Sequence, residues 1–190
     1  MRKKISPKAI IIPTISLFLI CLVVTAVLAL TNSITADKIA ENEAQSKQES
    51  MFSVLPAAAS FEEIEPDVLY QGFDKDKKPV GYAISTSAQG YGGSVKVMTG
   101  IDSAGVIVGV DVFYNDDETP GLGKNTSNES FRAQYKGMNT KEDIVVSKDN
   151  TTGAAQEIDA VTSATISSRA VTKAVNEACR IYNEKAKEAK

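Results

Sequence analysis

The sequence of 190 residues contains no histidine, no tryptophan and only two cysteines. Cys21 lies in a hydrophobic run near the N-terminus and Cys179 lies in the last helical pattern, so the two form neither a disulfide framework nor a C-x-x-C site. Histidine-ligated haem, four-cysteine iron–sulfur clusters, a typical zinc site and a Ser-His-Asp triad are therefore excluded within this chain. We expect no metal site, and if the protein transfers electrons its carrier is organic.

Outside the N-terminus the basic residues are scattered along the chain and form no cluster. The net charge is −3, and the one cluster of basic residues is Arg2, Lys3, Lys4 and Lys8 at the N-terminus. A nucleic-acid-binding protein needs a basic patch or stripe on its folded domain. The sequence therefore predicts no nucleic-acid partner.

An uncharged hydrophobic block, Ala9 to Leu30, follows the basic cluster. As a helix, its roughly 22 residues rise about 33 Å, enough for a hydrocarbon core of about 30 Å. A cleavable signal peptide is the alternative, but its apolar region usually runs about 7 to 15 residues and ends at a small-residue cleavage site. The length favours a retained anchor in the lipid bilayer.

The charges on the two sides of this block predict its orientation. Basic residues precede it, whereas residues 31–50 hold more acidic than basic side chains. By the positive-inside rule we expect residues 1–8 in the cytoplasm and 9–30 across the cell (inner) membrane as a single pass. Residues 31–60 are expected to form a helical stalk and linker, and 61–190 an extracytoplasmic domain.

The patterns after residue 60 indicate one α+β domain. Four β-branched or aromatic runs separated by short turns favour an antiparallel meander, at residues 68–73, 80–87, 94–98 and 106–114. A short helix at 127–135, a strand at 143–147 and an amphipathic helix at 166–187 follow, and residues 56–66 read as a linker or short helix. We expect an antiparallel sheet with helices packed on one face.

Small and hydroxylated residues fill the stretch from Asp159 to Ser168, directly before the last helical pattern. The first N–H groups of a helix lack intrahelical partners and its dipole is positive there, so an anion is stabilised without Lys or Arg. This pattern predicts a phosphate site with Thr165 at its centre. A Ser/Thr cluster in this position is also the ordinary signature of a helix N-cap, and from this stretch alone both interpretations stay open.

Two glycine-containing segments lie upstream, Gly90-Tyr-Gly-Gly93 and Glu118-Thr-Pro-Gly-Leu-Gly123. Taken singly, each is a turn, and Pro120-Gly121 is a type II turn pair. Together with the Asp159–Ser168 stretch, in this order, they resemble the FMN-binding domain family shared by the RnfG and NqrC subunits of respiratory complexes. The resemblance covers roughly residues 70 to 190.

The resemblance implies roles for particular residues. In the family, the last Thr of the Asp159–Ser168 motif carries FMN through a phosphoester attached by a separate flavin transferase, which implies Thr165 as the acceptor. Asp159, Thr162, Ser163, Ala164 and Ser167 fill the other motif positions, with Ser163 where Gly is usual. Asp159 either is read by the transferase or caps the loop.

The two upstream segments are expected near the flavin. Gly121 and Gly123 would let the backbone approach the isoalloxazine ring, with Leu122 packing on it and Glu118 and Thr119 shaping the loop. Tyr91, beside Gly92, either stacks on the flavin or packs locally. A surface role for Lys124 is favoured over a place beside the flavin.

The function implied by the resemblance is that of an RnfG-like electron-carrying subunit of a membrane-bound, ion-translocating ferredoxin:NAD⁺ oxidoreductase. Its expected partners are the other subunits of the complex and the flavin transferase. An NqrC-like subunit of a Na⁺-translocating NADH:quinone reductase is the related alternative. A non-redox, membrane-anchored binding domain is the alternative from a different class.

Overall fold

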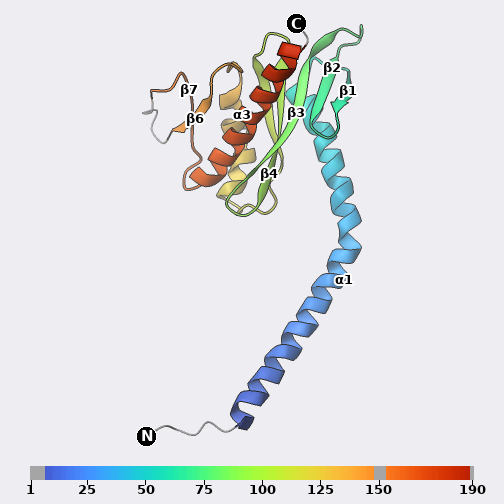
Figure 1. The fold of residues 1–190 in the computed structure, drawn as a ribbon, viewed down its shortest axis with the longest axis vertical. Coiled ribbons are helices and arrows are strands. Elements are labelled where there is room, and N and C mark those ends of the chain that lie inside the picture. Colours follow the sequence, from blue (N-terminus) through green and yellow to red (C-terminus); the bar gives the residue numbers. More distant parts are fainter. Residues whose placement is uncertain (1–6, 148–152, 189–190) are drawn as a thin grey trace. The chain divides into compact units, whose positions relative to one another are not determined.

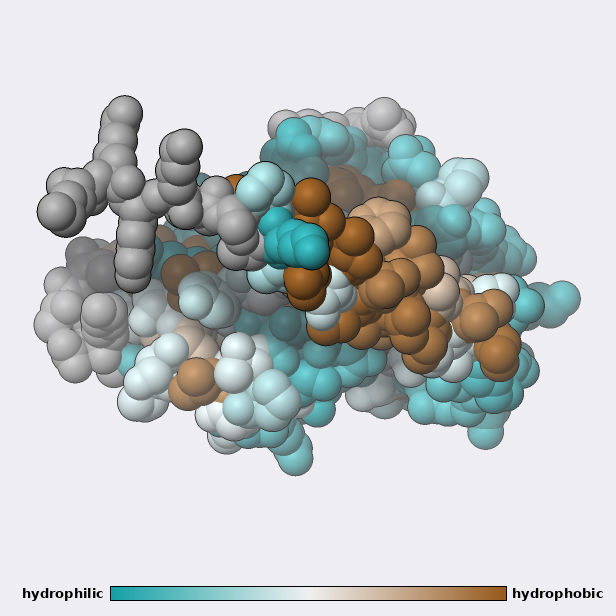
Figure 2. Space-filling view, turned by 90° about the horizontal axis from the view of Figure 1, so that it is seen from below, coloured by the Kyte–Doolittle hydropathy of each residue, from teal (hydrophilic) through white to brown (hydrophobic). Residues whose placement is uncertain are grey.

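The computed structural model describes residues 7–147 and 153–188, and the chain divides into two compact units, Met1–Ala44 and Gln45–Lys190. The first unit consists, in its described part, of the long helix α1 (Pro7–Val54), which continues into the second unit (Figure 1). Large apolar side chains between Ile10 and Leu30 are exposed all around this helix (brown in Figure 2). By length and composition α1 could cross a membrane.

The second unit is built on a five-stranded antiparallel sheet in the order β1-β2-β3-β4-β5. Its strands are β1 (Ser60–Glu65), β2 (Leu69–Phe73), β3 (Pro79–Gln89), β4 (Ser94–Asp102) and β5 (Ile107–Tyr114). Each strand pairs with the next along the chain, so the expected meander and the α+β class are confirmed. A separate parallel pair joins β6 (Ile144–Ser147) to β7 (Gln156–Asp159).

Helix α3 (Thr165–Glu188) covers one face of the sheet, over β3 and β4 (red in Figure 1). Alternate residues of the strands, among them Ile84, Val97 and Ile101, form the main core with the apolar face of α3, including Val171 and Val175. Short helical turns close one edge of this core: η1 (Gly123–Ser127), α2 (Glu129–Arg132) and η2 (Ala133–Tyr135). The expected helix at 127–135 is therefore broken into shorter pieces.

The other face of the sheet is covered by the end of α1 and the turn that follows it. Val54 and Leu55 are each 1% exposed and pack with Ala58, Ala83 and Met98. The sequence predicts helices on one face and a stalk and linker over residues 31–60, whereas the compact unit begins at Gln45. The reason is that apolar side chains at the end of α1 bury the face that α3 leaves open.

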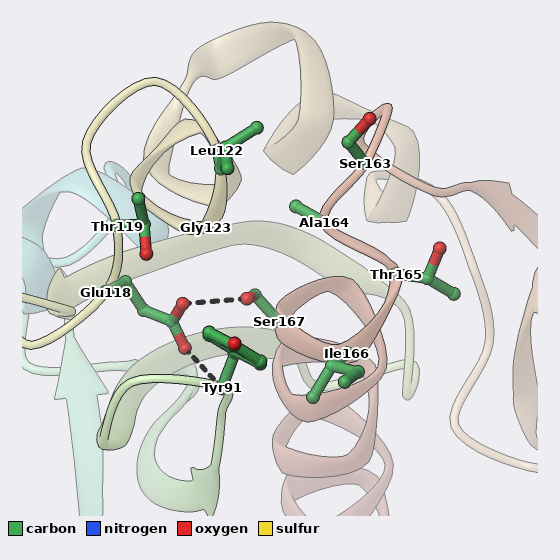
Figure 3. Close-up of a pocket in the computed structure, with 10 residues that line it drawn as sticks. All are labelled: Tyr91, Glu118, Thr119, Leu122, Gly123, Ser163, Ala164, Thr165, Ile166 and Ser167. Atoms are coloured by element: carbon green, nitrogen blue, oxygen red, sulfur yellow. Dashed lines mark hydrogen bonds between the residues drawn. The ribbon is translucent and has the colours of Figure 1, made fainter.

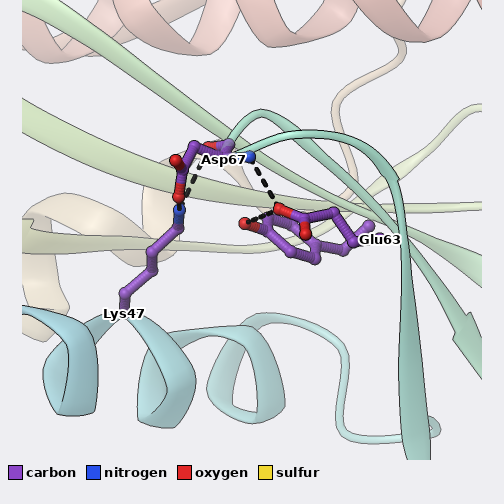
Figure 4. A network of polar contacts seen from close by, with 4 residues as sticks. Lys47, Glu63 and Asp67 are labelled. Atoms are coloured by element: carbon purple, nitrogen blue, oxygen red, sulfur yellow. Dashed lines mark hydrogen bonds and ion pairs between the residues drawn. The ribbon is translucent and has the colours of Figure 1, made fainter.

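Polar contacts also fasten the end of α1 to the β1–β2 turn (Figure 4). The Lys47 ammonium donates to Asp67 Oδ1 at 2.8 Å and to the Asp67 carbonyl at 3.1 Å. Glu63 in turn accepts from the Asp67 N–H and from the Tyr70 hydroxyl. The helix end is thus bonded to the turn as well as packed on the sheet.

Strand β1 corrects the interpretation of residues 56–66 as a linker or short helix. Ser60–Glu65 is extended and, among the described strands, pairs only with β2, at the edge of the sheet. Nearly all of its side chains are exposed, so it carries none of the apolar alternation that reveals a half-buried strand. Strand β7 is likewise absent from the sequence prediction, because its four residues, Gln-Glu-Ile-Asp, include one apolar side chain, whereas the equally short β6 has three.

We predict that Leu55→Ala lowers the free energy of unfolding by about 2–4 kcal/mol, because it leaves a cavity under the second face of the sheet. Urea unfolding of the full chain in detergent, followed by tyrosine fluorescence, measures this change. Ser53→Ala, at an exposed neighbouring position, is the matched control and should change stability by less than about 0.5 kcal/mol. Equal effects of the two substitutions would contradict a core role for the helix end.

Candidate functional site

A cavity of 420 Å³ opens where the two glycine-containing segments meet the start of α3 (Figure 3). It is lined by Tyr91, Glu118, Thr119, Leu122, Gly123, Ser163, Ala164, Thr165, Ile166 and Ser167. Three segments that are far apart in the sequence therefore share one site. The residues predicted for the site in the first turn of α3 all line this cavity, as do most of those predicted in the two glycine-containing segments.

Glu118 joins the three segments. Its side chain is 2% exposed, and its Oε1 accepts from the Tyr91 N–H at 2.7 Å and the Gly92 N–H at 3.4 Å. Its Oε2 accepts from the Ser167 hydroxyl at 2.8 Å. One buried carboxyl group thus ties the glycine-rich turn and the loop at 118–123 to the first turn of α3.

Glycines make room for this carboxyl group. A Cβ on Gly90 would lie 2.0 Å from Glu118 Oε1, and one on Gly123 would lie 1.9 Å from Oε2. Neither distance is possible between non-bonded atoms. A side chain at position 123 would therefore clash with the Glu118 carboxyl group, and the approach of Gly123 to the flavin ring stays a prediction.

Gly121 has a different role in the turn. The Leu122 N–H donates to the Thr119 carbonyl at 3.1 Å, and Gly121 has a φ of 77°, as the type II turn predicted from Pro120-Gly121 requires. A Cβ on Gly121 would meet no described atom of this chain within 4 Å, so the role of this glycine within the protein is to supply the backbone angle of the turn, and its approach to the flavin ring stays a prediction. Nearby, Lys124 forms an ion pair with Asp116 at 3.0 Å, outside the cavity lining.

The start of α3 presents free backbone donors. The carbonyl of Ala164 accepts from the Ser168 N–H at 2.9 Å, so the helix begins directly after Ala164, which has no polar side chain to cap it. Within the described part of the chain, the N–H groups of Thr165, Ile166 and Ser167 have no hydrogen-bond acceptor. An anion placed here would be stabilised by these donors and by the helix dipole.

The hydroxyl groups of the stretch have other partners. Ser168 Oγ accepts from the Val161 N–H at 3.0 Å and donates to the Ala164 carbonyl, and Ser167 Oγ is bonded to Glu118. Among the described contacts, no hydroxyl in this stretch accepts from the first N–H groups of α3. The N-cap interpretation requires a capping side chain, and none is found among these contacts. The N–H groups that the phosphate interpretation requires therefore remain available to an anion.

Ser163 has a φ of 62°, in the left-handed region. A side chain is disfavoured there, which gives a physical reason for the glycine that the resembling family usually has at this position. The turn is closed by the Ala164 N–H, which donates to the Val161 carbonyl at 2.9 Å. Ser163 thus bends the chain into the helix start.

The two threonines of the motif line different hollows. Thr165, half-buried at the first position of α3, lines the cavity described above. Thr162 lines a neighbouring, more polar hollow of 780 Å³ together with Asp159, Gly121 and Gln134. Leu122 and Ser163 line both, so they form the boundary between them. Gly92 lines neither.

Exposed apolar side chains surround the mouth of the Thr165 cavity. Tyr91 is 72% exposed, Leu122 is 42% exposed and Ile166 is 55% exposed. Ile166 fits the three- and four-residue spacing of the apolar residues in the amphipathic helix predicted at 166–187, but it is exposed. It lies one turn before the packed part of α3, and only the folded structure shows that it belongs to the site.

Cys179, the cysteine of the second unit, is a core residue. Cys179 is 4% exposed on the packed face of α3, and burial, followed by the charge of Asp143, raises the pKa of its thiol to about 11. A thiol with this pKa stays protonated at neutral pH and is a poor nucleophile or ligand.

These features define a class of protein: a sheet-and-helix domain with a cavity in which backbone N–H groups at a helix start, unpaired among the described residues, lie beside exposed apolar side chains. Family models match this chain as an FMN-binding domain over residues 90–180 and as an RnfG N-terminal region over residues 1–54. The chain belongs to the family of RnfG subunits of ion-translocating ferredoxin:NAD⁺ oxidoreductase complexes, as the following relatives show.

The G subunit of the Na⁺-translocating complex of Acetobacterium woodii is 36% identical over 189 residues, and the match covers 90% of each chain. The G subunit of the proton-translocating complex of Clostridium ljungdahlii is 31% identical, and the match covers 87% of this chain and 85% of that one. These matches confirm the RnfG-like assignment, and a membrane protein fits both the family and the apolar helix α1.

A solved structure shows the same fold. The C subunit of the Na⁺-translocating NADH-quinone reductase of Parabacteroides distasonis matches with a TM-score of 0.52 and 21% identity, and the match covers 60% of each chain. At this identity the likeness concerns the fold alone. It agrees with a sheet-and-helix domain common to both kinds of subunit.

We predict that Ser163→Gly stabilises the domain by about 0.5–1 kcal/mol, because glycine adopts a positive φ without steric cost. Thr162→Gly, at the preceding residue, where φ is not positive, should destabilise by a similar amount because it only increases the freedom of the unfolded chain. Urea unfolding of the chain without cofactor measures both. A loss of stability in Ser163→Gly would show that the Ser163 side chain makes a contribution larger than its backbone strain.

Proposed function

We propose that this chain is the flavin-carrying, electron-transferring subunit of an ion-translocating ferredoxin:NAD⁺ oxidoreductase complex, with FMN held as a phosphoester on Thr165. The observation that carries the proposal is the position of Thr165. It is the first residue of α3, lines the cavity and stands among N–H groups that lack acceptors in the described chain. The relatives named above are subunits of such complexes.

The residues present fit the two chemically different ends of FMN. Its phosphate matches the helix start, where backbone donors replace the Lys or Arg that the cavity lining lacks among the described residues. Its ring system is flat and largely apolar, and Tyr91, Leu122 and Ile166 offer apolar surface at the mouth. When bound, the isoalloxazine supplies the redox chemistry, and the protein supplies its position and surroundings.

Thr165 is favoured over Thr162 as the acceptor. In the attachment step the Thr165 hydroxyl gives up its proton and its oxygen bonds to the flavin phosphorus as the bond from that phosphorus to its leaving group breaks. In the family that the sequence resembles, a separate flavin transferase performs this step, and the product is heavier by one FMN less one water. Thr162 lies on the far side of the Leu122 and Ser163 boundary, in the more polar hollow. Asp159, in the same hollow, is available to a modifying enzyme approaching from that side.

A covalent bond between FMN and the chain prevents loss of the cofactor from an electron carrier that lies outside the cell membrane. The redox states of a flavin bind with different affinities, so an untethered cofactor would be lost from its weakest-binding state. We place the N-terminus in the cytoplasm and the second unit outside, from the basic residues that precede Ala9. The other subunits of the complex and the lipid bilayer are then its lasting partners.

We predict that coexpression with a flavin transferase gives a denatured chain heavier by one FMN less one water. Thr165→Ala should abolish the added mass, whereas Thr162→Ala should retain it, because only Thr165 faces the cavity. Mass spectrometry and in-gel flavin fluorescence after denaturation measure both. Yellow colour lost on denaturation would instead show non-covalent FMN, and a colourless folded chain would favour a non-redox binding domain.

We also predict the topology. Protease added to intact cells stripped of any outer layer should digest the region beyond residue 30 and spare a tag placed before residue 9. The physical reason is the positive charge before the hydrophobic block, which stays on the cytoplasmic side. Protection of the domain until the cells are lysed would reverse the orientation.

A further inference from the structure

Glu118 is a buried acid without a positive partner among the described side chains. Its carboxyl group accepts from the Tyr91 and Gly92 N–H groups and from the Ser167 hydroxyl, all of them neutral donors. Within the described residues, no Lys or Arg lines the cavity beside it. Both oxygens act as acceptors, which is the hydrogen-bonding pattern of a carboxylate.

We propose that Glu118 is the residue that positions the flavin site and lowers the flavin's reduction potential. This inference rests on the proposed function, because it requires the flavin to occupy the cavity that Glu118 lines. Glu118 acts on the cofactor in two ways, one through the shape of the site and one through its charge.

The effect on shape follows from the hydrogen bonds. Tyr91, which is exposed at the mouth, is held to the loop at 118–123 by its N–H bond to Glu118. Ser167 lies in the first turn of α3, two residues after Thr165, and is held by the other oxygen. Glu118 therefore fixes the apolar mouth relative to the helix start that would anchor the phosphate.

The effect on charge follows from burial. Uptake of an electron without a proton adds a negative charge to the flavin, and a carboxylate nearby opposes it. The opposition is strong only where water is excluded, since the energy between two charges rises as the effective dielectric falls. Glu118 is 2% exposed, whereas its neighbours Asp116 and Asp117 are exposed to solvent.

No described cation offsets this charge in the cavity. Lys124, in η1 directly after the loop, is paired with Asp116. The positive end of α3 is the one opposing feature in the described lining, and in the proposed function the phosphate occupies it. The net effect on the ring is therefore expected to be negative, which makes the flavin harder to reduce.

The test is Glu118→Gln in the flavinylated full chain, in detergent. Glutamine has nearly the same shape, its carbonyl oxygen accepts from the Tyr91 N–H, and its amide donates to Ser167 Oγ, so the tie is kept while the charge is removed. Asp117→Asn removes a charge from the adjacent, exposed position and is the matched control. The midpoint potential is measured by reductive titration with dithionite and mediator dyes.

We expect Glu118→Gln to shift the midpoint potential to a less negative value and Asp117→Asn to shift it clearly less. No shift, a shift to a more negative value, or equal shifts in the two variants would overturn the charge effect. The denatured mass of each variant shows that the flavin is still attached. Absence of flavin from the unchanged chain would overturn the proposed function, and the charge effect with it.

The hydrogen bonds by which Glu118 holds Tyr91 and Ser167 are tested without any flavin, in the Thr165→Ala chain. Adding Glu118→Ala should speed hydrogen exchange of the Tyr91 amide roughly tenfold or more, because the amide loses its hydrogen bond to a charged group. Adding Glu118→Gln replaces the charged acceptor by a neutral one and should speed exchange by a smaller factor. If the alanine variant does not fold, unchanged exchange in the glutamine variant would contradict the positioning role. Unchanged exchange in a folded Glu118→Ala chain, or equal acceleration in both variants, would contradict the positioning role.

Discussion

The site depends on the packing of α3 against one face of the sheet. Val171, Ala174, Val175 and Ala178 are at most 1% exposed, and they fix the helix along β3 and β4. Once the helix is fixed, its first turn must lie where the loop at 118–123 and the glycine-rich turn meet. The position of the free N–H groups is thus a consequence of apolar burial, and the Glu118 hydrogen bonds refine it.

Much of this arrangement could be predicted from the sequence. The β-branched runs indicated the meander, and the helical spacing indicated α3, because both patterns mark surfaces that are buried on one side. The three cavity segments were recognisable because each is rich in glycines or hydroxyl groups. They also follow one another along the chain in the order found in the family that the sequence resembles. That they share one cavity is a tertiary fact, which the resemblance implied and which local patterns alone could not.

The rest could not be predicted for identifiable reasons. Strand β1 is almost wholly exposed, so burial left no trace in its sequence. Val54 and Leu55 read as the end of a stalk, because their role depends on a sheet face formed by later residues. Ile166 fits the apolar stripe of α3 and yet is exposed at the cavity mouth. A serine does not by itself indicate a positive φ. The one indication at Ser163 was that the family which the sequence resembles usually has glycine at this position.

The central claim is that one particular hydroxyl, that of Thr165, joins the chain to its cofactor at the helix start. Trypsin cleaves after Lys148 and Arg169, which releases a peptide containing residues 149–169 and every hydroxyl of the motif. Fragmentation of this peptide by mass spectrometry, after isolation of the native complex, locates the added mass directly. We predict that the flavin phosphate is found on Thr165, and its location on any other residue, or a peptide of unmodified mass, would contradict the account.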